Sequence, residues 1–228
     1  MPEPHQPGGA RFVTFEGGEG VGKSTQVKRL VANLGRAGIE AVRTREPGGT
    51  PKAEAIRSLI LQGHSESWGV GAEAVLFAAA RLDHVNQLIA PNLASGKWVV
   101  CDRFADSTRA YQGLTGGVDD KLIGALEVLA LNGHTPDLTI MLDMDPEAAF
   151  KRVAQRAEAD GVAGYVDRFE KEDLDWHRRL REAFLGIAAA NIQRCVVISA
   201  DTDEDSLEAS IWETLTARFP EILTRQPA

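Results

Sequence analysis

A glycine-rich stretch near the start of the chain constrains the fold more than any other feature. Residues 16–25 read EGGEGVGKST and stand between an apolar run, RFVTF, and an amphipathic segment, QVKRLVANL. The stretch from Gly17 to Ser24 fits the pattern G-x-x-x-x-G-K-[ST]. In such a turn the backbone N–H groups point into a concavity at a helix N-terminus, where they bind phosphate. The sequence therefore predicts a strand, a phosphate-binding loop and a helix in succession.

This loop predicts a site for the phosphates of a nucleotide, together with a metal ion. The lysine adds a positive charge near the β- and γ-phosphates, and the serine hydroxyl can bind Mg²⁺. The residues expected to bind ATP here are Gly17, Gly18, Glu19, Gly20, Val21, Gly22, Lys23, Ser24 and Thr25.

The rest of the chain alternates short apolar runs with longer amphipathic segments. Strands are expected at RFVTF (11–15), IEAVRTR (39–45), KWVVCD (97–102), LTIMLD (138–143) and CVVISA (195–200). Helices are expected over 22–36, 50–62, 71–94, 119–132, 146–159, 168–190 and 205–218, with Pro146 and Ser206 as starts. Near-continuous apolar strands that alternate with helices are typical of a parallel sheet covered on both faces. We predict an α/β fold of the P-loop NTPase class, with a five-stranded parallel sheet, helices on both faces and a small lid.

Composition limits the possible partners and the compartment. The chain has 228 residues, a net charge of −8 and 43% hydrophobic residues. This length suits one domain, expected over 11–228 after a disordered leader at 1–10. The acidic balance argues against a protein that follows a nucleic-acid backbone or an anionic membrane. Cys101 and Cys195 lie in apolar runs, no apolar stretch is long enough to span a membrane and no secretion signal is evident, so we expect a cytoplasmic protein.

The ends of two predicted strands supply a second basic site. No N-K-x-D motif and no D-x-x-G after a strand is present, which argues against a GTPase switch. Instead, Asp102 and Arg103 end the third strand, at the sheet edge where open α/β folds bind ligands. The fork of Arg103 suits a second phosphate, joined by Arg45 at the end of the second strand. Asp102 could hold the hydration shell of Mg²⁺ or orient Arg103.

Two further segments suit a nucleoside. In AEAVLFAAARLDH (72–84), Phe77 and Arg81 stand four residues apart, so a base could stack on the first and bond to the second. The alternative is a core phenylalanine and a solvated arginine. The segment FADSTRAYQG (104–113) is rich in side chains that can read a polar edge, namely Ser107, Thr108, Arg109, Tyr111 and Gln112.

The motifs EGGEGVGKST, TREPGGT, FAAAR, DRF with STRAYQG, and PDLTIMLD together resemble those of bacterial thymidylate kinases, in the same order. The resemblance covers residues 11–219. It implies transfer of phosphate from ATP to dTMP, with Mg²⁺, to give dTDP, and it implies a homodimer. It also implies that Phe77 stacks on thymine, that Arg81 and Thr108 bond to the base edge, and that Tyr111 lies beside the deoxyribose.

The same resemblance assigns the phosphates. Arg45 and Arg103 would hold the phosphate of dTMP. Glu19, an acid inside the phosphate-binding loop, would face the acceptor near its 3′-hydroxyl and position it, directly or through Mg²⁺ or water. Its repulsion of the donor phosphates must be offset by neighbouring cations, which favours a site for two substrates. The expected catalytic residues are Lys23, Glu19, Arg103 and Arg156.

The segment 150–170, FKRVAQRAEADGVAGYVDRFE, resembles the lid of the family but is longer. We expect a lid over about 152–168, with Arg152 and Arg156 on one helix face and Arg168 beyond the loop. The four variable positions of the phosphate-binding loop hold no arginine, so the charge of the moving phosphoryl group must be neutralised from elsewhere. Arg156 is expected to do so, with Arg152 at the ATP.

Two alternatives stay open at this stage. A kinase for another deoxynucleotide or nucleoside would share these motifs, because base choice depends on side-chain geometry. A P-loop ATPase that switches a partner protein would turn over ATP without an acceptor.

Overall fold

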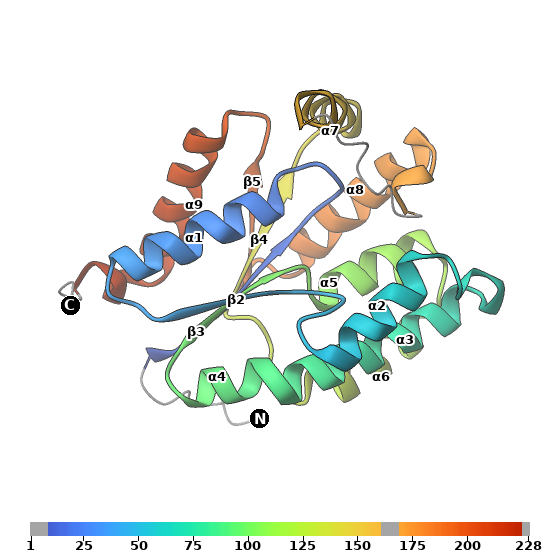
Figure 1. Ribbon diagram of the computed structural model, residues 1–228, viewed down its shortest axis with the longest axis horizontal. Helices are drawn as coiled ribbons and strands as arrows, with labels where there is room; N and C mark the ends of the chain where they lie inside the picture. Colours follow the sequence, from blue (N-terminus) through green and yellow to red (C-terminus); the bar gives the residue numbers. More distant parts are fainter. Residues whose placement is uncertain (1–8, 161–168, 225–228) are drawn as a thin grey trace.

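The computed structural model describes residues 9–160 and 169–224, except for the side chains of residues 156–160, 170 and 224 (Figure 1). Its centre is one sheet of five parallel strands in the order β2-β3-β1-β4-β5. The strands are β1 (Phe12–Glu16), β2 (Ala41–Arg45), β3 (Trp98–Asp102), β4 (Leu138–Asp143) and β5 (Cys195–Ser199). The five-stranded parallel sheet predicted from the apolar runs is confirmed. Each strand begins and ends within two residues of its predicted bounds.

Helices cover both faces of the sheet, as predicted. The α-helices are α1 (Lys23–Arg36), α2 (Pro51–Leu61), α3 (Val70–His84), α4 (Ala90–Ala94), α5 (Ala105–Thr108), α6 (Asp120–Leu131), α7 (Pro146–Asp160), α8 (Leu174–Ala190) and α9 (Glu204–Arg218). Two π-helical segments, η3 (Val85–Ile89) and η4 (Arg109–Thr115), continue α3 and α5. Short 3₁₀ turns are η2 (Glu66–Trp68), η5 (Phe169–Lys171) and η6 (Pro220–Thr224).

The core lies on the two faces of the sheet because side chains alternate along each strand. Val13 and Phe15 of β1 face a cluster that includes apolar residues of α1 and α9. Phe12 faces the other way, into a cluster with residues of η3 and α4. Figure 1 shows α1 and α9 on one side of the sheet, and α3, α4 and α6 on the other.

Helix starts follow local capping chemistry. The Thr50 side chain accepts a hydrogen bond from the backbone N–H of Ala53 ahead of Pro51, which opens α2. Asp203 caps α9, so this helix begins at Glu204 and not at Ser206, which the sequence suggested as the start. The helix expected over 168–190 begins only at Leu174, after the cap Asp173.

Two differences from the predicted organisation concern the start of the fold and one helical run. Ala10 is fully buried, and the carbonyl of Gly9 accepts a hydrogen bond from the Trp98 indole, so the last two residues of the expected leader belong to the fold. Residues 1–8 lie outside the described part. The helical run α5–η4 was not predicted, because its polar residues show no clear apolar period.

Among the described residues, no helix combines the length and apolarity that crossing a bilayer would require. Both cysteines are buried free thiols.

Candidate active site

The phosphate-binding loop, residues 17–22, joins β1 to α1 at the carboxyl edge of the sheet. Gly22 has φ +93° and caps α1, and a Cβ atom at Gly17 would collide with the carbonyl of Leu142, so both positions require glycine. Lys23 lies in the first turn of α1, and its Nζ donates to the carbonyl of Gly17 at 3.1 Å and to that of Gly18 at 2.5 Å. Burial, together with the nearby charge of Arg103, lowers the pKa of Lys23 to about 8.

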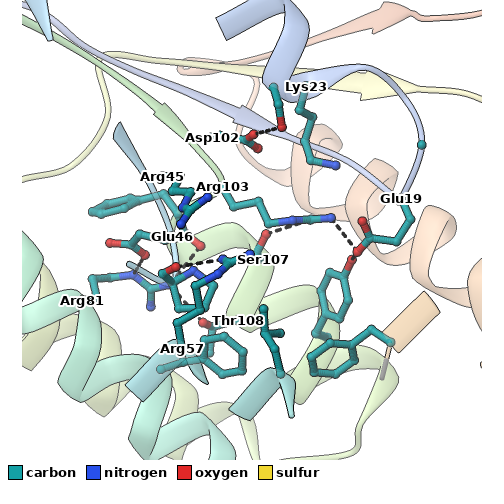
Figure 2. Close-up of a pocket in the computed structure, with 18 of the residues that line it drawn as sticks. Glu19, Lys23, Arg45, Glu46, Arg57, Arg81, Asp102, Arg103, Ser107 and Thr108 are labelled. Atoms are coloured by element: carbon teal, nitrogen blue, oxygen red, sulfur yellow. Dashed lines mark hydrogen bonds and ion pairs between the residues drawn. The ribbon is translucent and has the colours of Figure 1, made fainter. Parts of the chain in front are cut away.

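A cavity of about 390 Å³ opens beside this loop (Figure 2). The sequence-predicted residues that line it come from the loop, α1, β2, α3, β3 and α5–η4, which lie far apart in the chain. They are Glu19, Gly20, Gly22, Lys23, Ser24, Thr25, Arg45, Phe77, Arg81, Asp102, Arg103, Ser107, Thr108, Tyr111 and Gln112. The topology thus gathers most of the predicted site around one cavity.

Five predicted site residues do not line this cavity or cannot be placed in it. Gly17, Gly18 and Val21 line a smaller cavity of about 20 Å³ behind the loop. The Arg152 guanidinium donates to the carbonyls of Ala200 and Thr202, at 3.1 and 3.0 Å, after β5. The side chain of Arg156 and the segment 161–168, which includes most of the expected lid loop and Arg168, lie outside the described residues.

Glu19 is the centre of an ionic cluster at one end of the cavity. Its Oε1 accepts hydrogen bonds from Arg103 Nη2 at 2.7 Å and from the Tyr111 hydroxyl at 2.6 Å. Figure 2 shows the Arg103 guanidinium directed at this carboxylate. Burial alone would raise the pKa of Glu19, but the charges of Arg103 and Lys23 and the bond from Tyr111 outweigh it and lower the pKa to about 2. Glu19 is therefore ionised at neutral pH.

Arg103 is held in an unusual backbone conformation. Its φ of +67° lies in the left-handed region, which non-glycine residues rarely adopt, and its N–H donates to the carbonyl of Phe15. Arg103 Nη1 donates to the carbonyl of Gly17 at 2.9 Å, so one guanidinium bonds the loop at both Gly17 and Glu19. Burial by itself would lower the pKa of Arg103. The charge of Glu19 and the other acidic groups nearby outweigh burial and raise the pKa above its usual value, so Arg103 stays charged.

Asp102 and Ser24 form a pair beside the loop. Ser24 Oγ donates to Asp102 Oδ2 at 2.5 Å. The sequence left two roles open for Asp102, to orient Arg103 or to hold the hydration shell of Mg²⁺. The Arg103 guanidinium bonds Glu19 and makes no hydrogen bond with Asp102 in the described part of the chain. The Asp102 carboxylate instead stands next to the hydroxyl expected to bind Mg²⁺, and Figure 2 shows Asp102 near Lys23.

The far end of the cavity is built on α3 and η4. Phe77 lines it, and Arg81 is buried, with 2% of its surface exposed. The alternative of a solvated Arg81 is therefore wrong. Arg81 Nη2 donates to the Thr108 hydroxyl at 3.1 Å and to the carbonyl of Phe104 at 3.0 Å, and its Nε donates to Glu46 at 2.7 Å.

Sequence reasoning missed three charged residues at this site. Glu46 is the buried partner of Arg81. Arg57 lines the cavity and donates to the carbonyl of Pro47 at 2.9 Å. Glu16 ends β1 and accepts bonds from the backbone N–H groups of Phe104 and Ser107 and from the Ser107 hydroxyl. Glu46 is the acid within TREPGGT. It could have been predicted as a partner of Arg81, because a buried arginine requires a carboxylate.

Glu16 has a strongly shifted pKa. Burial is the largest cause, and repulsion by Asp106 adds to it, so the pKa of Glu16 rises to about 7. Asp106 is itself bound bidentately by Arg194, at 2.6 and 2.8 Å.

Two predicted arginines, Arg109 and Arg45, make ion pairs with acids of neighbouring helices. Arg109, expected among the residues that read a polar edge, points away from the cavity, because its guanidinium bonds Glu127 of α6 at 3.1 and 2.5 Å. Arg45 lines the cavity and its Nη2 bonds Glu54 of α2 at 3.2 Å. Arg45 is exposed, so a ligand anion could replace this contact.

The cavity therefore has a phosphate-binding loop with a lysine at one end and an aromatic ring with a buried arginine at the other. Beside the loop lie Arg45, at the end of β2, and Arg103, directly after β3. Such a space suits a phosphorylated nucleoside whose phosphate faces the loop. Fold and site together define a nucleoside monophosphate kinase of the P-loop class.

Comparisons with known proteins narrow this class. The chain belongs to the thymidylate kinase family, whose family model, described as "Thymidylate kinase", matches residues 15–211. It is 50% identical over 208 residues to a thymidylate kinase of Nitrobacter winogradskyi, covering 91% of this chain and 89% of the relative. It is 49% identical over 213 residues to that of a Bradyrhizobium species, covering 93% and 92%. A crystal structure of thymidylate kinase from Ehrlichia chaffeensis superposes with a TM-score of 0.73 at 32% identity, covering 92% of this chain and 100% of that one.

Proposed function

We propose that this protein transfers the γ-phosphate of ATP to dTMP, giving ADP and dTDP, a step in dTTP biosynthesis. The observation that carries the proposal is the single cavity in which Lys23 and the phosphate-binding loop face Arg45 and Arg103, with Phe77 and Arg81 at the far end. Membership of the thymidylate kinase family supports the choice of dTMP over another deoxynucleotide.

On the donor side, the loop would hold the phosphates of ATP. The N-terminus of α1 supplies N–H groups and a partial positive charge, and Lys23 adds a full charge. In the structure Lys23 donates to the carbonyls of Gly17 and Gly18, so it would exchange these acceptors for phosphate oxygens when ATP binds. Arg152 and Arg156 of α7 are proposed to act on the ATP from the lid, about 152–168.

Mg²⁺ would bind at Ser24 and Asp102. The hydroxyl and carboxylate oxygens, 2.5 Å apart at the start of the loop helix, are the hard donors that Mg²⁺ prefers. No cluster of three or more acids, histidines and cysteines able to hold a metal occurs in the described residues, which fits an ion bound by few protein oxygens, water and phosphates. When bound, Mg²⁺ would offset the negative charge of the transferring phosphates.

On the acceptor side, Arg45 and Arg103 would bind the phosphate of dTMP, with Phe77 stacked on thymine. Thr108, Gln112 and Arg81 are the polar groups at the base end of the cavity, and Ser107 and Tyr111 line its side. The contacts of Glu19 suggest a sharper role than direct contact with the 3′-hydroxyl. By bonding both Arg103 and Tyr111, Glu19 would fix the phosphate ligand and the sugar-side ring together.

Phosphoryl transfer requires alignment and charge on the equatorial oxygens of the moving group, and it requires no protein nucleophile. We therefore propose Lys23, Glu19, Arg103 and Arg156 as the catalytic set, in which Glu19 acts by ordering Arg103. The acceptor phosphate would lie within reach of the loop because Arg103 is bonded to the loop carbonyl of Gly17.

The assembly and location are also proposals. We propose one catalytic domain from residue 11 to 228, a cytoplasmic location in keeping with two free buried thiols, and a homodimer. Exposed apolar side chains on α3 and α6, two helices that pack together, support the last of these. They are Val75, Leu122, Val128 and Leu129, which we call the α3–α6 surface.

An ADP-release assay with ATP, Mg²⁺ and a panel of nucleoside monophosphates tests the proposal. We expect release only when dTMP is present, and loss of both affinity for dTMP and turnover in Arg103→Ala, because a bidentate contact fixes binding and alignment together. Equal turnover without any acceptor would instead support an ATPase switch, and a stronger response to another monophosphate would support a kinase with a different base choice.

A further inference from the structure

A buried polar network stands behind Arg81. Glu46 Oε2 accepts from Arg81 Nε at 2.7 Å, and Glu46 Oε1 is 2.9 Å from His84 Nδ1. His84 Nε2 is 2.7 Å from the Thr44 hydroxyl. All four side chains are at most 8% exposed. Figure 2 shows Arg81 beside Glu46, at the edge of the cavity.

The hydrogen-bond pattern assigns a tautomer to His84. The Glu46 carboxylate only accepts, so Nδ1 must carry the proton that it donates. In the neutral ring, Nε2 then accepts from the Thr44 hydroxyl, so both ring nitrogens have a partner. The network is closely packed, because a Cβ atom at Gly49 would come within 2.6 Å of both His84 Nε2 and Thr44 Oγ1.

This network uses up most of the donors of Arg81. A guanidinium has five N–H groups in one plane. Glu46 takes the Nε–H, and the carbonyl of Phe104 and the hydroxyl of Thr108 take those of Nη2. Within the described part of the chain Nη1 has no acceptor, yet it is not among the fully buried polar atoms that lack partners. Nη1 is therefore the part of Arg81 that reaches the cavity.

We propose that Glu46 and His84 are positioning residues that fix Arg81 so that Nη1 alone is offered to the acceptor base. The inference rests on the proposed function, since it places the base at this end of the cavity. A nitrogen that only donates matches the carbonyl oxygen O4 of thymine and opposes the amino group at position 4 of cytosine. Because the fork is already occupied, Arg81 cannot turn a second terminal nitrogen toward a different base edge.

A purely structural role would give a different result. If Glu46 and His84 only neutralised a buried cation, their loss would lower stability and weaken all substrates alike. Positioning instead predicts a loss confined to the acceptor and to the choice between dTMP and dCMP, since a site built to bond one group rejects an analogue that leaves it unpaired.

A pair of near-isosteric variants of His84 separates these cases. The amide nitrogen of His84→Asn can take the place of Nδ1 and donate to Glu46, whereas that of His84→Gln takes the place of Nε2 and leaves Glu46 without this donor. We expect His84→Asn to keep kcat/KM for dTMP within about threefold. We expect His84→Gln to lower it at least about tenfold and to lower the ratio of kcat/KM for dTMP over dCMP by a similar factor, with the KM for ATP unchanged. His64→Gln, at an exposed position between α2 and η2, is the matched control.

Glu46→Gln supplies a readout that does not depend on activity. To keep its bonds, the amide must present its NH₂ to His84, so the ring has to move its proton to Nε2 and donate to Thr44. We expect ¹⁵N NMR to find the Nδ1–H tautomer of His84 in the wild type and the Nε2–H tautomer in Glu46→Gln, and we expect the ratio of dTMP to dCMP turnover to fall.

Two outcomes would overturn the inference. One is a folded His84→Gln that keeps wild-type kinetics and the wild-type ratio, and the other is equal loss toward dTMP and ATP in both His84 variants. Neither result touches the proposed function, which fails only if the wild-type protein does not phosphorylate dTMP. If His84→Gln does not fold, the Glu46→Gln ratio and tautomer decide.

Discussion

Glu19 illustrates how one side chain connects two halves of the site. Alone, a carboxylate inside a phosphate-binding loop would oppose the negative donor. Here the Arg103 guanidinium and the Tyr111 hydroxyl both bond Glu19 Oε1, and Arg103 also bonds the loop at Gly17. The acid therefore ties the acceptor-side residues to the donor-side loop, and its own charge is balanced before any substrate arrives.

Tyr111 should exclude ribonucleotides by filling the space of a 2′-hydroxyl. Its ring lines the cavity and is held edge-on by Phe169 at 5.2 Å and by Phe184 at 6.1 Å. We expect Tyr111→Ala to reduce the preference for dTMP over its ribo analogue by about 1 to 3 kcal/mol, because added bulk is rejected only as firmly as its wall is rigid. Steady-state kcat/KM for both nucleotides measures this. Tyr111→Phe, which keeps the ring, should retain the preference, and an unchanged ratio in Tyr111→Ala would rule out the role.

Glu16 should make stability depend on pH. Its pKa is raised to about 7 in the folded protein, against 4.5 for the free side chain, so its contribution to stability is greatest below pH 4.5 and is lost as the pH rises to about 7. Glu16→Gln cannot ionise and so does not lose this contribution. As the pH rises from 5 to 8, we expect its free energy of unfolding to increase relative to that of the wild type by about 1 to 3 kcal/mol. Denaturant unfolding at both pH values gives the difference.

The exposed Glu213→Gln on α9 serves as the control for this measurement and should show the same difference from wild type at both pH values. A Glu16→Gln difference that does not change with pH would mean that Glu16 is ionised throughout, held by its three hydrogen-bond donors.

At the scale of elements, the parallel sheet gathers the site because the ends of β1, β2 and β3 meet at one edge. In the strand register, Asp102 of β3 is the partner of both Phe15 of β1 and Arg45 of β2. The phosphate-binding loop leaves β1 at this edge, and α5–η4 leaves β3 there. Short strands of five or six residues are therefore enough to place groups from six segments around one cavity.

The helix α7 carries the prediction for catalysis. The variable loop positions hold no arginine, so we expect Arg156 to neutralise the moving phosphoryl group. Arginines with this role contribute about 10³- to 10⁵-fold in turnover. Arg156→Ala should lower kcat at least about a hundredfold while the dissociation constant of dTMP stays nearly unchanged, as measured by single-turnover kinetics and calorimetry. Lys151→Ala, an exposed residue on the same helix, is the control, and a near-normal kcat in Arg156→Ala would show that the arginine only solubilises the helix.

At the scale of the whole molecule, the α3–α6 surface is the place where we expect two copies to meet. Val128 and Leu129 are 79% and 61% exposed, a high value for adjacent apolar residues of a helix. The double substitution Val128→Asp with Leu129→Asp would place unpaired charges in the interface, at a cost of about several kcal/mol, so we expect it to yield monomers in analytical ultracentrifugation. Ile192→Asp, at an apolar position that is 73% exposed beyond α8, should leave the assembly unchanged. A double variant with the wild-type mass would place the contact elsewhere.

The sequence by itself determined the class of fold and the contiguous parts of the site. Alternating apolar runs and amphipathic segments predict strands and helices because each pattern has a local period, and glycines next to Lys-Ser predict the loop because they set the local backbone. The segments that supply Arg45, Arg81 and Arg103 could be named for the same reason.

Only the tertiary structure decided which side chains pair. Glu46 lies 35 residues from Arg81 in the chain, and Glu19 lies 84 residues from Arg103, so both pairs depend on the strand order. Arg109 points toward α6 and not into the cavity because of the helical winding of α5–η4. This winding could not be predicted from the sequence, since the segment shows no regular spacing of apolar residues. Local patterns encode the path of the backbone, whereas the partner of a buried charge is chosen by the low-dielectric space that distant segments close around it.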